Sequence, residues 1–294
     1  MVEPTPLDST WLREHPLPEP DNDADKNERG RVLVIGGART VPGGLLLTAE
    51  GALRAGAGKV RLATIEGAAI PLGVAMPECA VFALPERADG EIADDCAEAL
   101  EPLFERCDTI VAGPAMSCGR AAARIADLLI GASGCEAPLV LDAAALMRLP
   151  ERAKALADCG RPAILTPHIG EMAAMLECDA GEIEADRTAA VREAAARYHA
   201  ITLLKGATTL VATPEGETFA YAGGGVGLAT GGSGDVMTGI VGGLVARGAE
   251  PLVAVLWAVW LHGEAGRRCA EQTGPLGFLA RELPAHVPGL MRGV

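Results

Sequence analysis

The chain has 294 residues, of which 49% are hydrophobic and 22% are charged. This balance is ordinary for a globular protein, and the length allows one large domain or two small ones. The formal net charge is −14, and a surface this acidic repels phosphate backbones, so we expect no nucleic-acid partner. A nucleotide ligand is not excluded, because backbone amides or a bound cation can create a local anion site.

The cysteines and the longest apolar runs indicate where in the cell the protein is expected. The eight cysteines form no C-x-x-C pair and nothing resembles a signal peptide, so we expect free thiols and a cytoplasmic location. The longest apolar runs, 252–261 and 240–245, fall short of the roughly 20 residues that span a bilayer, so we expect no membrane segment.

Residues 1–30 differ from the rest of the chain. They are rich in Pro, Asp and Glu, and Pro16, Pro18 and Pro20 disfavour a regular helix. We predict an extended N-terminal arm over 1–30. No internal repeat or low-complexity linker follows, so we predict a single catalytic domain over 31–294.

From residue 31 onward, short apolar runs alternate with helical stretches. The expected strands are 32–35, 59–64, 79–84, 109–112, 139–141, 163–165 and 201–204. The expected helices among them include 42–55, 92–105 and 119–130. This alternation predicts an α/β fold whose mostly parallel central sheet has helices on both faces.

The pattern changes after residue 204. The runs 208–213 and 217–221 are separated by Pro214-Glu215-Gly216, which predicts a late antiparallel hairpin. Helices are then expected over 235–247, 251–271 and 277–286.

The segment most suggestive of chemistry is Gly231-Gly232-Ser233-Gly234-Asp235. Its glycines allow a tight turn, and free N–H groups at the start of the following helix would form an anion hole for a phosphate. Asp235 in the first helical turn is placed to accept a proton from a hydroxyl beside that phosphate. The alternative is a capping aspartate after a flexible loop.

Other candidates follow expected strands. Lys205 follows the strand 201–204 and would neutralise a phosphate, or it is a surface lysine in a turn. His168 and Glu171 follow the strand 163–165, at the strand ends where ligands bind in open α/β folds, although both would also serve as helix-capping residues. Asp142 at a strand end and the loop Gly36–Gly44 are weaker candidates.

Taken in order, these segments resemble the ADP/ATP-dependent NAD(P)H-hydrate dehydratases, a branch of the ribokinase-like superfamily. The matching stretches are 32–37, 42–58, 140–142, 166–172, 205–209 and 227–239. The last is the most specific, reading Gly-Leu-Ala-Thr-Gly-Gly-Ser-Gly-Asp-Val-Met-Thr-Gly. The resemblance implies a ribokinase-like three-layer sandwich.

It also implies an activity. Such enzymes repair hydrated NADH and NADPH: with Mg²⁺ and ADP or ATP they phosphorylate the hydroxyl at C6 of the nicotinamide ring, and phosphate then leaves. Asp235 would be the catalytic base, with the anion hole at Gly232, Ser233 and Gly234. The nucleotide would be bound by Lys205, Gly206, Ala207, Thr208, Thr209 and Gly234. The hydrated dinucleotide would be bound by Gly44, Ala115, His168 and Asp235. Glu171 would assist Mg²⁺ indirectly, and a homo-oligomer such as a tetramer is expected.

The chain departs from the family pattern at several positions. Ala115 stands where Gly is usual, Ile169 for Pro, Ala144 for Asp, a Gly223–Gly225 run for an Asn-rich turn, and Arg281 for Asp. Two other functions are therefore weighed: a ribokinase-like kinase of a small hydroxylated molecule, and a degenerate nucleotide-binding protein without catalysis.

Overall fold

The structure, a computed structural model, describes residues 3–21 and 23–294. Its framework is a 10-stranded sheet with the spatial order β1-β10-β9-β8-β7-β6-β5-β2-β3-β4. The strands are β1 (Thr5–Pro6), β2 (Arg31–Ile35), β3 (Lys59–Ile65), β4 (Cys79–Leu84), β5 (Thr109–Ala112), β6 (Leu139–Leu141), β7 (Ala163–Leu165), β8 (Ile201–Leu204), β9 (Thr208–Ala212) and β10 (Thr218–Ala222).

The seven strands from β4 to β8 are parallel, and only β9 runs against its neighbours. In the hairpin Thr218 lies opposite Ala212. Residues Val32–Ile35 are fully buried, as expected where both faces of a parallel sheet are covered. The predicted parallel sheet with a late antiparallel hairpin is therefore confirmed.

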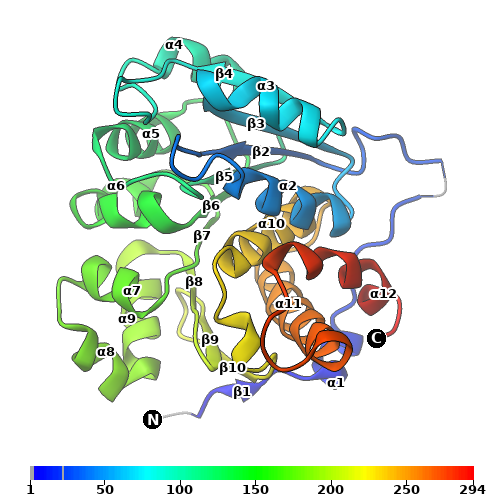
Figure 1. Ribbon diagram of the computed structural model, residues 1–294. Coiled ribbons are helices and arrows are strands. Elements are labelled where there is room, and N and C mark those ends of the chain that lie inside the picture. Colours follow the sequence, from blue (N-terminus) through cyan, green and yellow to red (C-terminus); the bar gives the residue numbers. More distant parts are fainter. Residues whose placement is uncertain (1–2, 22) are drawn as a thin grey trace.

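Helices cover both faces of the sheet (Figure 1). On one face lie α2 (Gly44–Arg54), α10 (Ser233–Ala246) and α11 (Pro251–Thr273), with α3 (Glu66–Ala75) beside β4 and α12 (Val287–Met291) beside α11. On the other lie α5 (Arg120–Gly131), α6 (Ala153–Asp158), α7 (Ile169–Leu176), α8 (Ala180–Ala185) and α9 (Arg187–Tyr198).

Glycines set the position of α10 against α2. A Cβ placed on Gly239 would lie 2.1 Å from the Thr48 carbonyl oxygen, and one on Gly243 would lie 2.5 Å from that of Ala52. The two helix backbones are thus in direct contact. This close packing fixes where the N-terminus of α10, and with it Asp235, meets the sheet.

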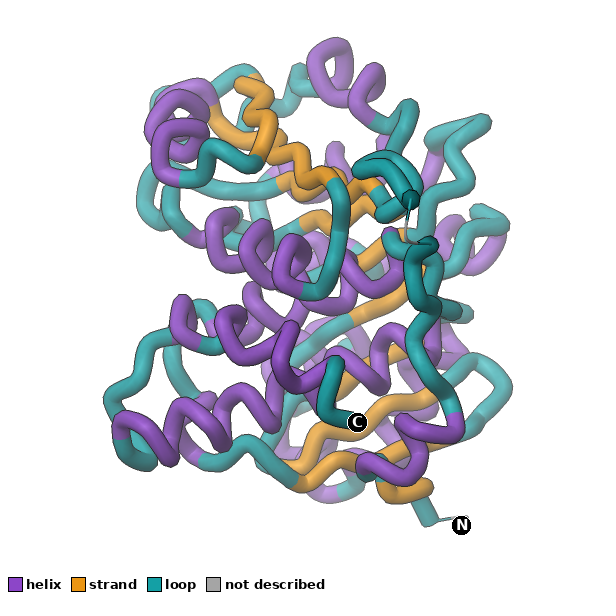
Figure 2. The backbone as a smooth tube through the Cα atoms, turned by 90° about the vertical axis from the view of Figure 1, so that its right-hand side faces the viewer, coloured by secondary structure: helices purple, strands orange, loops and turns teal. Residues whose placement is uncertain are grey.

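The N-terminal arm is less extended than predicted. It contains β1, which pairs in parallel with β10, and the helix α1 (Ser9–Glu14), whose first amides are capped by Asp8. The Trp257 ring donates to the His15 carbonyl at 2.8 Å, and Arg247 donates to the Pro18 carbonyl at 2.7 Å. The described residues of the arm therefore pack against α11 and the end of α10, and Figure 2 shows the arm on the side of the molecule that faces the viewer.

Two predicted helices are mostly absent. Within 92–105 only α4 (Ala97–Leu100) and the 3-10 turn Glu101–Leu103 form, and Ile92 lies instead in a bridge with Glu86. The predicted helix 277–286 is instead two 3-10 turns, Ala280–Glu282 and Pro284–His286. Pro284 has no N–H to donate to the preceding turn. Among the described residues, no helix is long and apolar enough to cross a membrane.

Candidate functional site

The candidate site lies at the carboxyl edge of the parallel strands. Chain order reverses between β2 and β5: β3 and β4 lie to one side of β2, while β5, β6, β7 and β8 lead away on the other. In open α/β sheets such a switch point leaves a crevice for ligands. The loops after β2 and β5 meet there, where the Gly37 amide donates to the Pro114 carbonyl at 3.0 Å.

Asp142, directly after β6, is the centre of a buried polar cluster. Its carboxylate accepts hydrogen bonds from Lys205 Nζ at 2.9 Å, Thr166 Oγ1 at 2.8 Å and Thr238 Oγ1 at 2.9 Å. Burial alone would raise the pKa of Asp142, but the Lys205 charge and these three hydrogen bonds lower it. Asp142 is thus held as an anion.

Lys205, directly after β8, carries the positive charge of the cluster. Its Nζ also lies 3.8 Å from Glu171 Oε2. Burial would lower the pKa of Lys205, but Asp142 and Glu171 outweigh it and raise the pKa. The pKa of Glu171 is raised mainly by burial, with Asp142 adding to the effect. The ammonium is therefore a fixed cation beside the cavity.

His168 and Glu171 form the N-terminal cap of α7. His168 Nδ1 accepts from the Gly170 amide at 3.0 Å, and Glu171 Oε2 accepts from the His168 amide at 2.8 Å. The reciprocal bonds are a capping box. The helix-capping role that the sequence offered as an alternative for His168 and Glu171 is thus present, and Glu171 also lies near Lys205.

Asp235 lies in the first turn of α10, next to this cluster. Burial, together with the charges of Asp142 and Glu171, raises the pKa of Asp235 to about 7, although Lys205 acts in the opposite direction. A carboxylate with a pKa near neutrality is a better proton acceptor than an ordinary aspartate. The electrostatics therefore suit a general base.

A cavity of about 680 Å³ opens beside these groups, within the range of small-molecule sites. Seven of the predicted site residues line it: His168, Lys205, Gly206, Ala207, Thr209, Ser233 and Gly234. Its far end is mostly apolar, with Tyr221, Val226, Leu228 and Val259. A charged end and an apolar end suit a nucleotide's phosphates and base.

Other predicted residues lie elsewhere. Thr208 opens β9, and its carbonyl accepts from Arg187 at 3.0 Å. Gly232 is the N-cap of α10 with a φ of +88°, and its Cα faces Leu47. Neither is among the residues that line the cavity, and Asp235 is not among them either. Gly232 therefore shapes the loop before the Gly234 amide, whereas the Ser233 amide donates to the Thr230 carbonyl at 3.3 Å.

Gly44 and Ala115, which were predicted to bind the substrate, lie next to each other at the switch point. Ala115 has a φ of +55°, in the left-handed region that favours glycine. A Cβ placed on Gly44 would lie 2.4 Å from the Ala115 methyl. The methyl that replaces the family's usual hydrogen thus occupies the space beside Gly44, and the backbone is strained to hold it.

Comparison with known proteins agrees with this geometry. Residues 32–288 match the family model described as NAD(P)H-hydrate dehydratase. The ADP-dependent (S)-NAD(P)H-hydrate dehydratase of Xanthomonas campestris is 42% identical over 280 residues, covering 95% of this chain and 93% of the relative. The chain belongs to the NAD(P)H-hydrate dehydratase family.

Solved structures extend the comparison within and around this family. The ADP/ATP-dependent NAD(P)H-hydrate dehydratase of Bacillus subtilis, co-crystallised with ATP and Mg²⁺, is 29% identical with a TM-score of 0.85, covering 100% of this chain and 99% of that one. A ribokinase-like superfamily protein of Enterococcus faecalis is 25% identical with a TM-score of 0.82, covering 98% and 95%. The predicted family and ribokinase-like fold are confirmed. The chain spans about half the length of the bifunctional NAD(P)H-hydrate repair enzymes that it also matches.

Two residues of the candidate site, Thr238 and His262, were not predicted from the sequence to have a role in it, and Asp142 was only a weak candidate. Asp142 follows a buried strand, which is a weak signal for a ligand site. Thr238 lies one helical turn after Asp235, a spacing that places both on one face of α10. His262 of α11 contacts Ser233 at 2.8 Å, and nothing local in the sequence indicates this contact.

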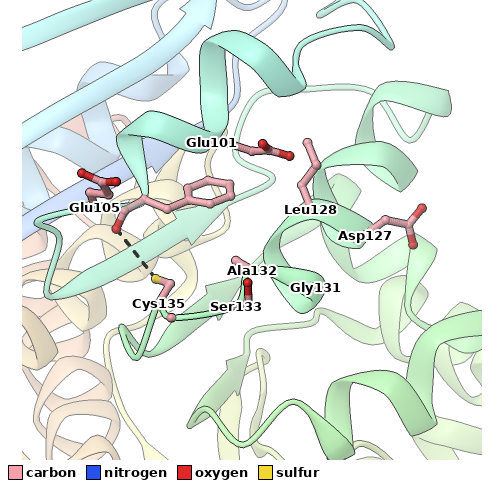
Figure 3. Close-up of a pocket in the computed structure, with 10 residues that line it drawn as sticks. Glu101, Glu105, Asp127, Leu128, Gly131, Ala132, Ser133 and Cys135 are labelled. Atoms are coloured by element: carbon pink, nitrogen blue, oxygen red, sulfur yellow. Dashed lines mark hydrogen bonds between the residues drawn. The ribbon is translucent and has the colours of Figure 1, made fainter.

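A different cavity of about 420 Å³ lies between the 3-10 turn Glu101–Leu103 and the end of α5 (Figure 3). Its charged lining side chains are the carboxylates Glu101, Glu105 and Asp127, which would repel a phosphate. The Cys135 thiol beside them donates to the Phe104 carbonyl at 3.8 Å. This cavity contains none of the predicted site residues, so we assign it no part in the chemistry.

Proposed function

We propose that this chain is an ADP- or ATP-dependent dehydratase that restores hydrated NADH and NADPH. The observation that carries the proposal is the position of Asp235. Its carboxylate, with a pKa of about 7, lies in the first turn of α10 and feels the charge of Lys205, and α10 packs against α2, the helix that begins at Gly44. A nucleotide in the cavity and a dinucleotide at the switch point would meet at this residue.

The proposed reaction begins with proton transfer to Asp235. The C6 hydroxyl of the hydrated ring gives its proton to this carboxylate as its oxygen attacks the terminal phosphate of the nucleotide. The amide of Gly234 and the Ser233 hydroxyl, at the positive end of the α10 dipole, stabilise charge on the moving phosphoryl group. Hydroxide is a poor leaving group and phosphate a good one, so elimination of phosphate then restores the ring.

In this proposal, different cavity residues bind different parts of the nucleotide. Lys205 and Gly206 bind the phosphates, since a fixed ammonium favours anions. Ala207 and Thr209 line the path toward the base, while His168 borders the substrate side. Thr208 acts through the backbone of β9, because its side chain is not part of the cavity lining.

Mg²⁺ fits the charge balance of the site. Asp142, Glu171 and Asp235 are countered by one ammonium, so a nucleotide's phosphates would add to an excess of negative charge. No group of three His, Cys, Asp or Glu side chains within residues 3–21 and 23–294 is arranged to hold a metal by itself, and Mg²⁺ typically uses one or two carboxylates with phosphates and water. Glu171, through water, is the carboxylate we assign to it. Bound there, Mg²⁺ would neutralise phosphate charge.

We also propose a cytoplasmic homo-oligomer, with a tetramer as the expected form. Ile70 and Val74 on α3 are both 79% exposed, beside the edge strand β4. Such an apolar pair one helical turn apart favours contact with another subunit. Residues 31–294 are proposed to be the catalytic domain, with the arm packed against it.

The decisive experiment follows the near-ultraviolet absorbance of the reduced nicotinamide after adding hydrated NADH, Mg²⁺ and either ADP or ATP. We expect recovery that requires the nucleotide and is lost in Asp235→Asn, which keeps the shape of the side chain but cannot accept the proton. Release of a stable phosphorylated product would indicate a kinase instead. Nucleotide binding without any turnover would indicate a degenerate binder.

A further inference from the structure

Ser233 and His262 form a buried polar pair at the charged end of the cavity. Ser233 is the first residue of α10, and His262 lies in the middle of α11. His262 Nε2 is 2.8 Å from the Ser233 hydroxyl oxygen and 3.0 Å from the Ser233 carbonyl oxygen. Both residues are buried, and both line the cavity.

The two oxygens around Nε2 decide where the imidazole proton lies. A carbonyl oxygen only accepts, so an unprotonated Nε2 would direct its lone pair at the lone pairs of the Ser233 carbonyl. A protonated Nε2 instead donates toward both oxygens. The ring is neutral, because burial lowers the pKa of His262 to about 4, so it carries one N–H, and the contacts favour placing it on Nε2.

The tautomer controls what the Ser233 hydroxyl offers to the cavity. When its oxygen accepts from Nε2–H, its own proton is free to be donated elsewhere. With the opposite tautomer that proton would be used on Nε2, and the hydroxyl would turn lone pairs toward an incoming anion. A phosphate is an acceptor only, so the first arrangement attracts it and the second repels it.

The free proton has a defined destination. Gly234 follows Ser233, and a Cβ placed on Gly234 would lie 3.4 Å from Lys205 Nζ. Ser233, Gly234 and Lys205 all line the same cavity, so a phosphate bound beside the ammonium would lie next to the start of α10.

We propose that His262 is a positioning residue that, through its Nε2–H, makes the Ser233 hydroxyl an obligate donor to the terminal phosphate of the nucleotide. The inference rests on the proposed function, which supplies the nucleotide. It adds a group that acts on the phosphate through Ser233.

The first test is the nitrogen NMR spectrum of protein labelled on histidine. The five histidines of the chain give separate signals, and His262→Gln identifies the one that disappears. We expect the Nε2–H tautomer for His262, and the same tautomer after adding ADP. The Nδ1–H tautomer in the nucleotide complex would overturn the proposal, and this readout requires no catalytic activity.

The second test measures ADP and AMP binding to Ser233→Ala, His262→Leu and the double variant by calorimetry. A hydrogen bond to a charged group predicts about tenfold weaker ADP binding in each single variant, with little further loss in the double variant because both act through one hydroxyl. The side-chain amide nitrogen of glutamine is the same number of bonds from Cβ as Nε2 of histidine. His262→Gln should therefore retain most of the ADP affinity that His262→Leu loses. Additive losses, or no rescue by Gln, would mean that His262 only packs.

The two tests separate this inference from the proposed function. If wild-type protein binds ADP but never restores hydrated NADH, the dehydratase proposal fails while the tautomer and the binding cycle still decide the role of His262. If turnover is present, we expect the His262→Leu change to raise KM for the nucleotide and lower kcat, with KM for hydrated NADH unchanged.

Discussion

The two halves of the candidate site are built differently. On the nucleotide side, after β6, β7 and β8, charged and hydroxyl side chains bond one another: Asp142 alone accepts from Lys205, Thr166 and Thr238. On the substrate side, after β2 and β5, the loops Gly36–Gly37 and Gly113–Ala115 present mainly backbone and small side chains. One half works by charge and the other by shape.

The difference indicates how each half responds to substitution. A buried ion pair loses several kcal/mol when one partner is removed, because the other charge is left uncompensated. A surface shaped by glycine and alanine is sensitive instead to single methyl groups, as at Gly44 and Ala115. Of the positions where this chain departs from the family pattern, Ala115 lies in the substrate half. Ala144, Ile169 and Gly223–Gly225 lie on the nucleotide side, where Lys205 is retained.

The largest expected effect is on the charged half. Lys205→Met should lower the free energy of unfolding by about 3 kcal/mol, since Asp142 would remain buried without its cation. It should also weaken ADP binding by about a hundredfold or more. Denaturant unfolding and calorimetry measure the two effects. Adding Asp142→Leu to Lys205→Met should restore part of the stability but not the ADP affinity; a double variant less stable than Lys205→Met would contradict the pairing.

The next effect concerns Asp235 and pH. Folding raises the pKa of Asp235 to about 7, so the native state binds this proton more tightly than the unfolded state. The resulting stabilisation of the fold is lost as pH rises through that value. Asp235→Asn should therefore be more stable than wild type by about 2 kcal/mol above pH 7, and little different below the ordinary aspartate pKa.

Thermal unfolding across pH measures this difference. Asp158→Asn, at the exposed end of α6, is the matched control and should shift stability little at any pH. Equal stability of Asp235→Asn and wild type at alkaline pH would mean that Asp235 is not held as a weak acid. In wild type, kcat/KM should rise through an apparent pKa near 7.

A smaller effect is expected on the shape half. Ala115→Gly removes a left-handed alanine and should stabilise the fold by about 0.5–1 kcal/mol, net of the extra freedom of glycine in the unfolded chain. It should lower KM for hydrated NADH and leave KM for the nucleotide unchanged. Thermal unfolding and initial rates with each substrate varied measure these changes.

Gly44→Ala provides the opposite perturbation. Its new methyl would overlap that of Ala115, at 2.4 Å, so it should destabilise the fold by about 1–3 kcal/mol. Combining it with Ala115→Gly should recover most of this loss. If the double variant is as unstable as Gly44→Ala alone, the two methyls do not compete for one space.

The smallest effect is expected at the cavity beside α5. Cys135→Ser should change the free energy of unfolding by less than about 0.5 kcal/mol, since the residue is only partly buried, and should leave kcat and both KM values within about twofold. A loss of activity there would show that the site extends beyond the carboxyl edge of the sheet.

Much of the architecture could be predicted from local pattern. The runs 32–35 and 139–141 are apolar because both faces of the sheet are covered, so their strands were expected at these positions. Within the helix predicted over 92–105 only residues 97–103 are helical, and the helix predicted over 277–286 is instead two 3-10 turns, where Pro284 has no N–H to donate. The arm was predicted to be extended, yet it pairs with β10, a contact that no local pattern reports.

The candidate site divides in the same way. The sequence alone determined the glycine-rich turn before Asp235, because free amides at a helix start depend only on neighbouring residues. Only the tertiary structure decided that Lys205 bonds Asp142, 63 residues away, that Thr238 bonds it from 96 residues away, and that His262 meets Ser233. It also decided the raised pKa of Asp235, because burial and neighbouring charges depend on which strands lie side by side, and that order is not encoded in any single segment.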